Sequence, residues 1–197
     1  MAVAVETVAR GLTPEEYLER ERRAEFKSEY RDGEIVAMTG ASIAHNRINA
    51  NLMRELGVQL RDKPCDVFAQ DLKTRTTPTR FSYPDVIVIC GEPEFLDENE
   101  DVVTNPTVIV EILSPSTEAY DRGEKFAAYQ QRESFQEYVL VAQDRLSVEH
   151  YTRQEGNLWL YERLDRPDAR LNLPSIGCEA ALSDIYYRVD VTRRAEP

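Results

Sequence analysis

The chain has 197 residues, of which 42% are hydrophobic and 30% are charged, as is ordinary for one globular domain with additions. The net charge of −12 at pH 7 argues against simple binding of a polyanion, for which a basic domain is expected. No apolar run approaches the ~20 residues that span a bilayer, and residues 1–10 do not resemble a signal peptide. Three distant cysteines, Cys65, Cys90 and Cys178, predict reduced, buried thiols in a cytoplasmic protein.

The N-terminal part, residues 12–40, is predicted to form a helix followed by a hairpin. Residues 13–16 supply a threonine N-cap, a proline at the first helical position and the glutamate of a capping box. The helix is expected to run to residue 24 or 25 and to lie on the surface, because it is heavily charged. Residues 26–38 follow as a hairpin, because Asp32-Gly33 favours a type I′ turn.

A second helix is predicted over residues 43–61, where Ile48, Leu52, Leu56 and Leu60 recur at a spacing of four. His45 falls in its first turn. Residues 66–76 are then expected to form one strand, with Lys73 and Arg75 on the same face. These two cations are compatible with contacts to a phosphate backbone and equally with an ordinary solvated face.

Two short apolar strands come next, and each contains one carboxylate. Asp85 opens the first strand, which runs to residue 89, and Glu111 lies inside the second, residues 108–113. The acidic stretch between them, residues 92–101, is expected to be a solvated connection. Because an unpaired buried carboxylate is costly, each acid is expected to have a hydrogen bond, a cation or a metal as partner.

The C-terminal half is predicted to contain a helix, a strand and a hairpin. The helix spans about residues 120–133, with Phe126 and Tyr129 as core candidates and Lys125 beside Tyr129. The remaining elements are a strand at 137–142, hairpin arms at 147–152 and 158–163, an extended segment at 171–176, a short helix at 180–186 and a frayed end at 192–197. His150, on the first hairpin arm, is expected at the surface. This order predicts an α/β fold with a mixed sheet flanked by helices.

Asp85 and Glu111 are the sharpest candidates for chemistry. Hard oxygen ligands suit Mg²⁺ or Mn²⁺, and the carbonyl of Ile112 is a further candidate ligand. Such an ion lowers the pKa of a bound water, while Lys125 would orient that water or neutralise a phosphate. The plainer alternative is a strand-entry turn at Asp85, an arginine partner for Glu111 and a solvated Lys125. Ser114 is not a convincing nucleophile, because neither histidine has a spacing that supports a triad.

Several segments together resemble the Uma2 family of the PD-(D/E)xK restriction-endonuclease-like superfamily. They are Gly33-Glu34, His45 with its helix, Tyr83-Pro84-Asp85-Val86, the run from Val110 to Thr117, and Asp121 through Lys125 to Tyr129. The resemblance covers about residues 13–186 and implies an α-β-β-β-α-β core at about 43–142. The N-terminal helix and hairpin at 12–40 and a C-terminal hairpin extension at 145–186 would be additions within one domain.

The resemblance also implies roles for individual residues. Asp85 would be the first acid of the motif and Glu111 the second. The usual lysine two residues after the second acid is Leu113 here, so Lys125 on the following helix is its natural replacement. Glu29 resembles an additional upstream acid, for which Glu34 competes, and His45 matches a family position of uncertain role.

The leading functional hypothesis is a Mg²⁺- or Mn²⁺-dependent endonuclease acting on nucleic acid, DNA in the first place. Asp85, Glu111 and Ile112 would bind the metal, and Lys125, Glu29 and His45 would complete the site. A homodimer in the cytoplasm is the expected state. The alternatives are an interaction protein that keeps the nuclease fold without activity, which the acidic charge favours, and a metal hydrolase of small phosphoesters.

Overall fold

The computed structural model describes residues 7–38 and 40–191. Its helices are α1 (Pro14–Glu21), α2 (Ile43–Leu60), α3 (Glu118–Tyr120), the π-helical turn η1 (Asp121–Lys125), α4 (Phe126–Tyr129) and α5 (Leu182–Ile185). Its strands are β1 (Thr7–Arg10), β2 (Ser28–Arg31), β3 (Glu34–Ala37), β4 (Cys65–Ala69), β5 (Lys73–Thr77), β6 (Arg80–Ser82), β7 (Val86–Cys90), β8 (Val102–Val103), β9 (Val108–Leu113), β10 (Glu137–Ala142), β11 (Val148–Arg153), β12 (Trp159–Leu164), β13 (Arg170–Leu173) and β14 (Cys178–Ala181). The predictions for residues 1–6 and 192–197 lie outside the described residues.

The central sheet has the strand order β12-β11-β10-β9-β7-β4. Only β9 and β10 pair in parallel within it, so the sheet is mixed, as predicted. Helix α2 covers one face with its apolar stripe, and the segment from α3 through η1 to α4 covers the other with Phe126 and Tyr129. These faces confirm the predicted layers, because the apolar strands are covered on both sides.

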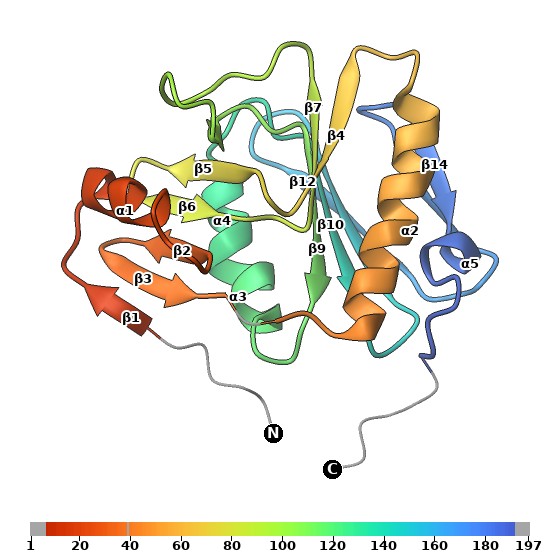
Figure 1. Ribbon diagram of the computed structural model, residues 1–197. Helices are drawn as coiled ribbons and strands as arrows, with labels where there is room; N and C mark the ends of the chain where they lie inside the picture. The colour runs from red at the N-terminus through yellow and green to blue at the C-terminus, as the bar shows by residue number, and fades with distance from the viewer. Residues whose placement is uncertain (1–6, 39, 192–197) are drawn as a thin grey trace.

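A second sheet, of order β1-β3-β2-β6-β5-β8, joins three strands from residues 7–37 to three strands from residues 73–103. The predicted capping box of α1 is present, and the predicted turn has Asp32 at φ 49° and Gly33 at φ 97°. Helix α1 packs on this sheet through Tyr17, which stacks on Tyr30 at 5.1 Å between ring centroids. The segment α3–η1–α4 lies between the two sheets (Figure 1), so residues of both can meet around it.

Residues 66–76 do not form one strand, which corrects the prediction. The backbone N–H groups of Asp71 and Leu72 both donate to the carbonyl of Ala69, at 2.7 and 3.3 Å, in a turn that separates β4 from β5. The two strands therefore belong to different sheets. Lys73 is only 3% exposed, beside Asp101 and over the ring of Tyr17, so it is not part of a solvated or phosphate-binding face.

The C-terminal segment buries a residue that was expected at the surface. His150 is 4% exposed, and its Nε2 lies 2.6 Å from Oε2 of Glu137. The other oxygen of Glu137 accepts from the backbone N–H of Ser175 at 2.8 Å. The segment predicted as simply extended instead turns back, because β13 pairs antiparallel with β14. The turn of this hairpin contacts Glu137, the partner of His150, on the side that alternation alone assigns to solvent.

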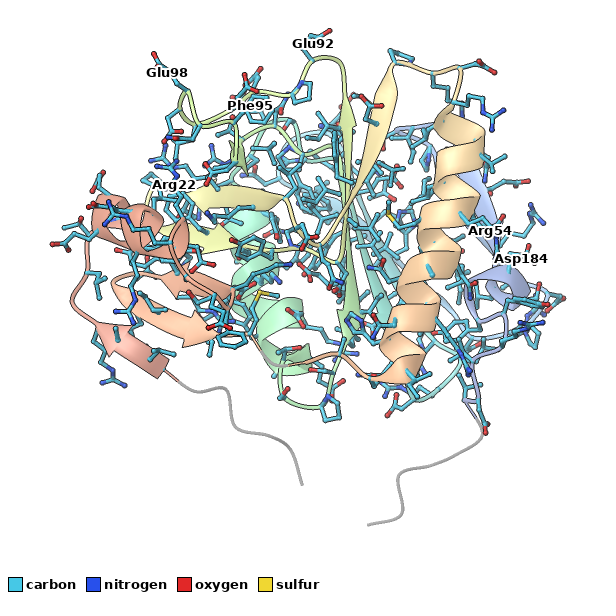
Figure 2. The ribbon with its side chains drawn as sticks, viewed as in Figure 1. Arg22, Arg54, Glu92, Phe95, Glu98 and Asp184 are labelled. Carbon is cyan, nitrogen blue, oxygen red and sulfur yellow. A yellow bond between two sulfur atoms is a disulfide. The ribbon has the colours of Figure 1, made fainter. Side chains whose placement is uncertain are left out.

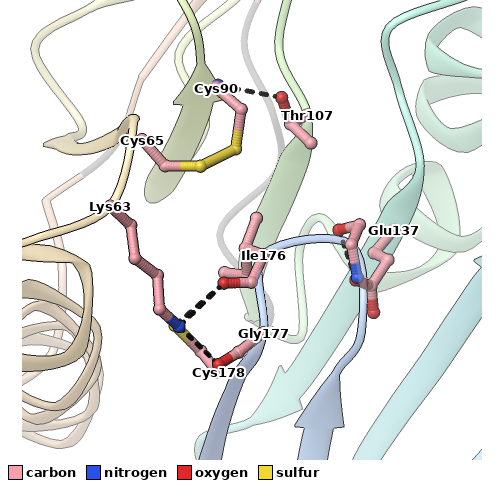
Figure 3. The surroundings of a disulfide bond; sticks show 9 residues. Lys63, Cys65, Cys90, Thr107, Glu137, Ile176, Gly177 and Cys178 are labelled. Atoms are coloured by element: carbon pink, nitrogen blue, oxygen red, sulfur yellow. Dashed lines mark hydrogen bonds between the residues drawn. A yellow bond between two sulfur atoms is a disulfide. The ribbon is translucent and has the colours of Figure 1, made fainter.

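The cysteines also correct a prediction. Cys65 on β4 lies directly opposite Cys90 on β7, and the two form a disulfide (Figure 3). Their sequence separation of 25 gives no sign of this pairing, which arises from the antiparallel register. Cys178 is a free, buried thiol, as predicted, with Lys63 Nζ 3.7 Å from its sulfur.

The acidic connection before β8 is largely exposed, as predicted, and Figure 2 shows Glu92 and Glu98 projecting from it. Arg22, just after α1, binds it through ion pairs of 2.7 Å to Asp97 and 2.9 Å to Asp101. In the part of the chain that the structure describes, no helix is both long and apolar enough to cross a bilayer.

Candidate active site

The two strand carboxylates lie on the same face of the central sheet. Val86 pairs with Val110 across β7 and β9, so the antiparallel register places Asp85 next to Glu111. Alternation puts Asp85 on the side of Ile87 and Glu111 on the side of Ile109, and both isoleucines belong to the cluster under α4. Both acids also line the same cavity. The two acids are therefore neighbours on one face of the sheet and in one cavity.

Asp85 is held by both of its oxygens. The backbone N–H of Ile112 donates to Oδ2 at 2.7 Å, and His45 Nε2 lies 3.1 Å from Oδ1. His45 is placed by the start of α2, where its backbone N–H donates to the N-cap hydroxyl of Ser42 at 3.0 Å. The other ring nitrogen of His45, Nδ1, is buried without a hydrogen-bond partner. His45 thus joins the site through Asp85.

Lys125 points from the helix back to the strands. Its ammonium lies 2.8 Å from Glu111, 3.2 Å from Glu29 and 3.6 Å from Asp121. Lys125 is the last residue of the π-helical turn η1. π-Helical turns are rare in proteins, and those that occur often lie at functional sites. Leu113, at the usual lysine position, is 4% exposed and packs into the apolar cluster. The ammonium therefore reaches the second acid from the helix, as the sequence suggested.

Burial and charge set the protonation of this cluster. Burial raises the pKa of Glu111 well above its usual value, although the charge of Lys125 lowers it. The charges of Asp121 and Asp85 raise this pKa further. Burial alone would lower the pKa of Lys125, but Glu111, Glu29 and Asp121 outweigh it and hold that pKa well above its usual value. Burial also opposes ionisation of Glu29, yet Lys125 and Arg31 outweigh it and lower the pKa of Glu29. Lys125 is therefore a firmly protonated donor.

The site opens into a cavity of about 440 Å³. Four carboxylates line it, those of Glu29, Asp85, Glu111 and Asp121. Of the described lining residues, only Arg31 and Lys125 carry a full positive charge. If all these groups are ionised, the cavity has an excess of two negative charges.

The structure also places the remaining candidates. Glu34, the competitor of Glu29, lies 42% exposed in an ion pair of 3.2 Å with Arg10, away from the cavity. Tyr129 is fully buried in the core, as predicted, with its hydroxyl 3.5 Å from Glu111. Ser114 forms hydroxyl contacts of 3.0 Å with Ser116 and 2.9 Å with Thr117 at the cavity wall.

Two residues of the site, Asp121 and Arg31, were not predicted as site residues from the sequence. Asp121 is four residues before Lys125 and shares its helical face, a spacing that was available as a signal. Arg31 follows Glu29 by two residues on β2, so alternation puts both on one face; its guanidinium lies 2.6 Å from Glu29 and 3.5 Å above the ring of Tyr120. Both residues add charge to the cavity and bind its other members.

The donor set fits a hard divalent cation. Carboxylate oxygens are the ligands that Mg²⁺ and Mn²⁺ prefer, and those of Asp85 and Glu111 both line the cavity. Within residues 7–38 and 40–191, no three His, Cys, Asp or Glu side chains are grouped closely enough to hold an ion alone. An ion here would need backbone and water ligands beside Asp85 and Glu111, which is usual for Mg²⁺.

Comparisons with known proteins place the chain in a family. Residues 14–183 match the Uma2 family, described as "Putative restriction endonuclease". Two Synechocystis proteins are similar: sll1609 is 39% identical, over 81% of this chain and 91% of its own length, and slr1290 is 38% identical, over 90% and 92%. A crystal structure from Anabaena variabilis, described as a "putative nuclease belonging to DUF820", superposes with a TM-score of 0.73 at 22% identity, covering 89% of this chain and 97% of that one. The chain therefore belongs to the Uma2 family and has the restriction-endonuclease-like fold.

Proposed function

We propose that the protein is a Mg²⁺- or Mn²⁺-dependent endonuclease that hydrolyses phosphodiester bonds of nucleic acid, DNA in the first place. The observation that carries the proposal is the Lys125 ammonium 2.8 Å from Glu111, in the cavity that Asp85 also lines. Two acids and a lysine around one cavity are the parts that metal-assisted phosphodiester hydrolysis requires. The description of the family and that of the structural neighbour support a nuclease.

Each residue has a distinct task in this proposal. Asp85, Glu111 and the carbonyl of Ile112 would hold the ion, which supplies an activated water and neutralises phosphate charge. Lys125 donates to the scissile phosphate or to the attacking water, a role that suits an ammonium whose pKa is raised. Lys125 needs protein partners to aim it, because a free lysine side chain has many rotamers.

Two residues act by positioning the others. Glu29, 3.2 Å from the ammonium, fixes Lys125 from the second sheet. His45, 3.1 Å from Asp85, orients the first acid and restricts its carboxylate to one rotamer. Neither residue needs to touch the substrate. Their loss is expected to lower the rate less than loss of Asp85, Glu111 or Lys125.

The test measures cleavage and ion binding on the same set of variants. Plasmid DNA, single-stranded DNA and RNA are incubated with the full chain and Mg²⁺ or Mn²⁺. Asp85→Asn, Glu111→Gln and Lys125→Met are each expected to lower the cleavage rate by roughly 100-fold or more, the usual loss for a charge-stabilising group. Glu34→Gln is the matched control, since that acid lies outside the cavity.

Cleavage that survives both Asp85→Asn and Lys125→Met would refute the proposed site. Calorimetry with Mn²⁺ should show binding to the wild type and a much weaker signal with folded Asp85→Asn protein. A wild type that binds no ion and cuts no nucleic acid would instead favour the inactive interaction protein. Turnover of a small phosphoester with all nucleic acids intact would favour the small-phosphoester hydrolase.

A further inference from the structure

Two parts of the cavity wall differ in chemistry. The wall from β3 and the following loop is apolar, with Val36, Ala37 and Met38. The wall after β9 carries the hydroxyls of Ser114 and its neighbours Ser116 and Thr117. A nucleotide has the same division, because an apolar base face adjoins a polar sugar and phosphate. The walls therefore offer complementary surfaces to its two halves.

The apolar wall continues to the surface. Met38 is 37% exposed although it lines the cavity. Ile43 is 72% exposed and follows Ser42, which also lines the cavity. A flexible, polarisable methionine makes favourable contacts with aromatic rings. The exposed apolar side chains of Met38 and Ile43 can therefore contact an unstacked base.

The depth of the site limits what can enter. Glu111 and Lys125 are 4% and 5% exposed, so a reacting phosphate must enter the cavity to reach them. Its volume of about 440 Å³ is on the scale of small-molecule sites. A duplex carries its phosphates on two stacked, paired strands, and it fits such a cavity only after local unpairing. An unpaired strand avoids that cost, which is a few kcal/mol.

The charges argue in the same direction. Attraction between free cations and phosphates supplies most of the affinity for a duplex. Here Arg31 is bound to Glu29 at 2.6 Å, Lys125 is bound to Glu111 at 2.8 Å, and the chain has a net charge of −12. Apolar contact with bases is therefore the attraction that the cavity wall offers, and unpaired strands expose their bases for it.

We propose that the cavity takes an unpaired nucleotide of single-stranded nucleic acid. The base lies against the wall of Val36 and Met38, and the sugar and phosphate run along Ser114, Ser116 and Thr117. This inference rests on the proposed function for the cleavage step. The preference for an unpaired strand is a property of binding and can be measured without cleavage.

The test first measures binding by fluorescence anisotropy in EDTA, where no metal-dependent cleavage occurs. The full-length wild type is titrated against labelled single-stranded DNA, single-stranded RNA and a DNA duplex of the same sequence. At least one single strand should bind about tenfold or more tightly than the duplex, a difference of ~1.4 kcal/mol. The DNA and RNA arms identify which polymer is preferred.

Two variants then test the apolar wall. Met38→Ala should weaken single-strand binding at least about fourfold, since it removes the side chain beyond Cβ and each CH₂-sized group that the base covers is worth a factor of ~4. Val58→Ala is the matched control, because Val58 is 64% exposed on α2 and does not line the cavity. Equal effects of the two variants would overturn the inference.

Duplex binding as tight as single-strand binding would also overturn it, as would no binding of any strand. Cleavage with Mn²⁺ is measured separately. Selective single-strand binding without cleavage would refute the proposed endonuclease and leave the inferred nucleotide site standing. Cleavage that depends on Asp85 but is equally fast on the duplex would refute the nucleotide site and leave the endonuclease standing.

Discussion

Replacing Lys125 with methionine tests the charge balance of the site. Methionine keeps most of the apolar stem and removes the ammonium that lies within 4.0 Å of Glu29, Glu111 and Asp121. Glu29 retains Arg31 at 2.6 Å, so the uncompensated charge falls on Glu111 and Asp121. Removing one partner of a buried ion pair costs about 3–5 kcal/mol. For a chain of this size, that corresponds to a fall in melting temperature of about 6–20 °C.

The loss should depend on pH. The raised pKa of Lys125 means that its charged form stabilises the fold at every pH below 10.5, so the wild type keeps this contribution across the neutral range. The pKa of Glu111 is raised above 4.5, so its contribution is present below pH 4.5 and is lost as pH rises through the folded-state pKa. Without the ammonium that pKa rises further. Lys125→Met should therefore lose more stability at about pH 8 than at about pH 5.

The assay is thermal and urea unfolding in EDTA at both pH values, so that no bound ion masks the charges. Lys27→Met is the control, because Lys27 forms an exposed ion pair with Asp71 that is worth about 0–1 kcal/mol. Adding Glu111→Gln to Lys125→Met should restore part of the loss at about pH 8. A Lys125→Met protein as stable as the wild type, or a loss of equal size at both pH values, would refute this reasoning.

Two further predictions concern the fold. Thiol titration of the unfolded, unreduced protein should count one reactive thiol, that of Cys178, and three after reduction; three before reduction would contradict the Cys65–Cys90 bond. Thr13→Ala removes the hydroxyl that accepts from the Glu16 backbone N–H at 3.2 Å, and it should lower the free energy of unfolding by about 1 kcal/mol in urea titration. An unchanged urea midpoint with an unchanged slope would show that this cap contributes nothing.

Local patterns predicted most of the elements. The capping box at Thr13, the Asp32-Gly33 turn and the four-residue spacing of Ile48 to Leu60 each act within a few residues, and each was confirmed. The resemblance and the apolar strands likewise gave the family and its fold. Signals of this kind survive folding because they depend little on distant parts of the chain.

The failures share a different cause, which is contact between segments far apart in the sequence. His150 is buried because Glu137 binds it and Ser175 covers that same glutamate. Cys65 meets Cys90 only through the register of β4 and β7. The candidate site also depends on contacts between distant segments. The motif suggested Lys125, but it did not predict that Asp121 and Arg31 would join the same cluster of charges.

The π-helical turn η1 has a consequence for comparing relatives. Each residue in an α-helix turns the chain by about 100°, so one residue more or fewer within Asp121–Lys125 would rotate the ammonium away from Glu111. Gly123 lies in this turn, and a Cβ added there would meet nothing within 4 Å. Substitution of Gly123 therefore changes little, whereas its deletion changes the helix phase. The direction of the lysine is thus encoded in the length of the turn. Relatives that keep both acids and the lysine but differ in this spacing are expected to direct the lysine away from the second acid.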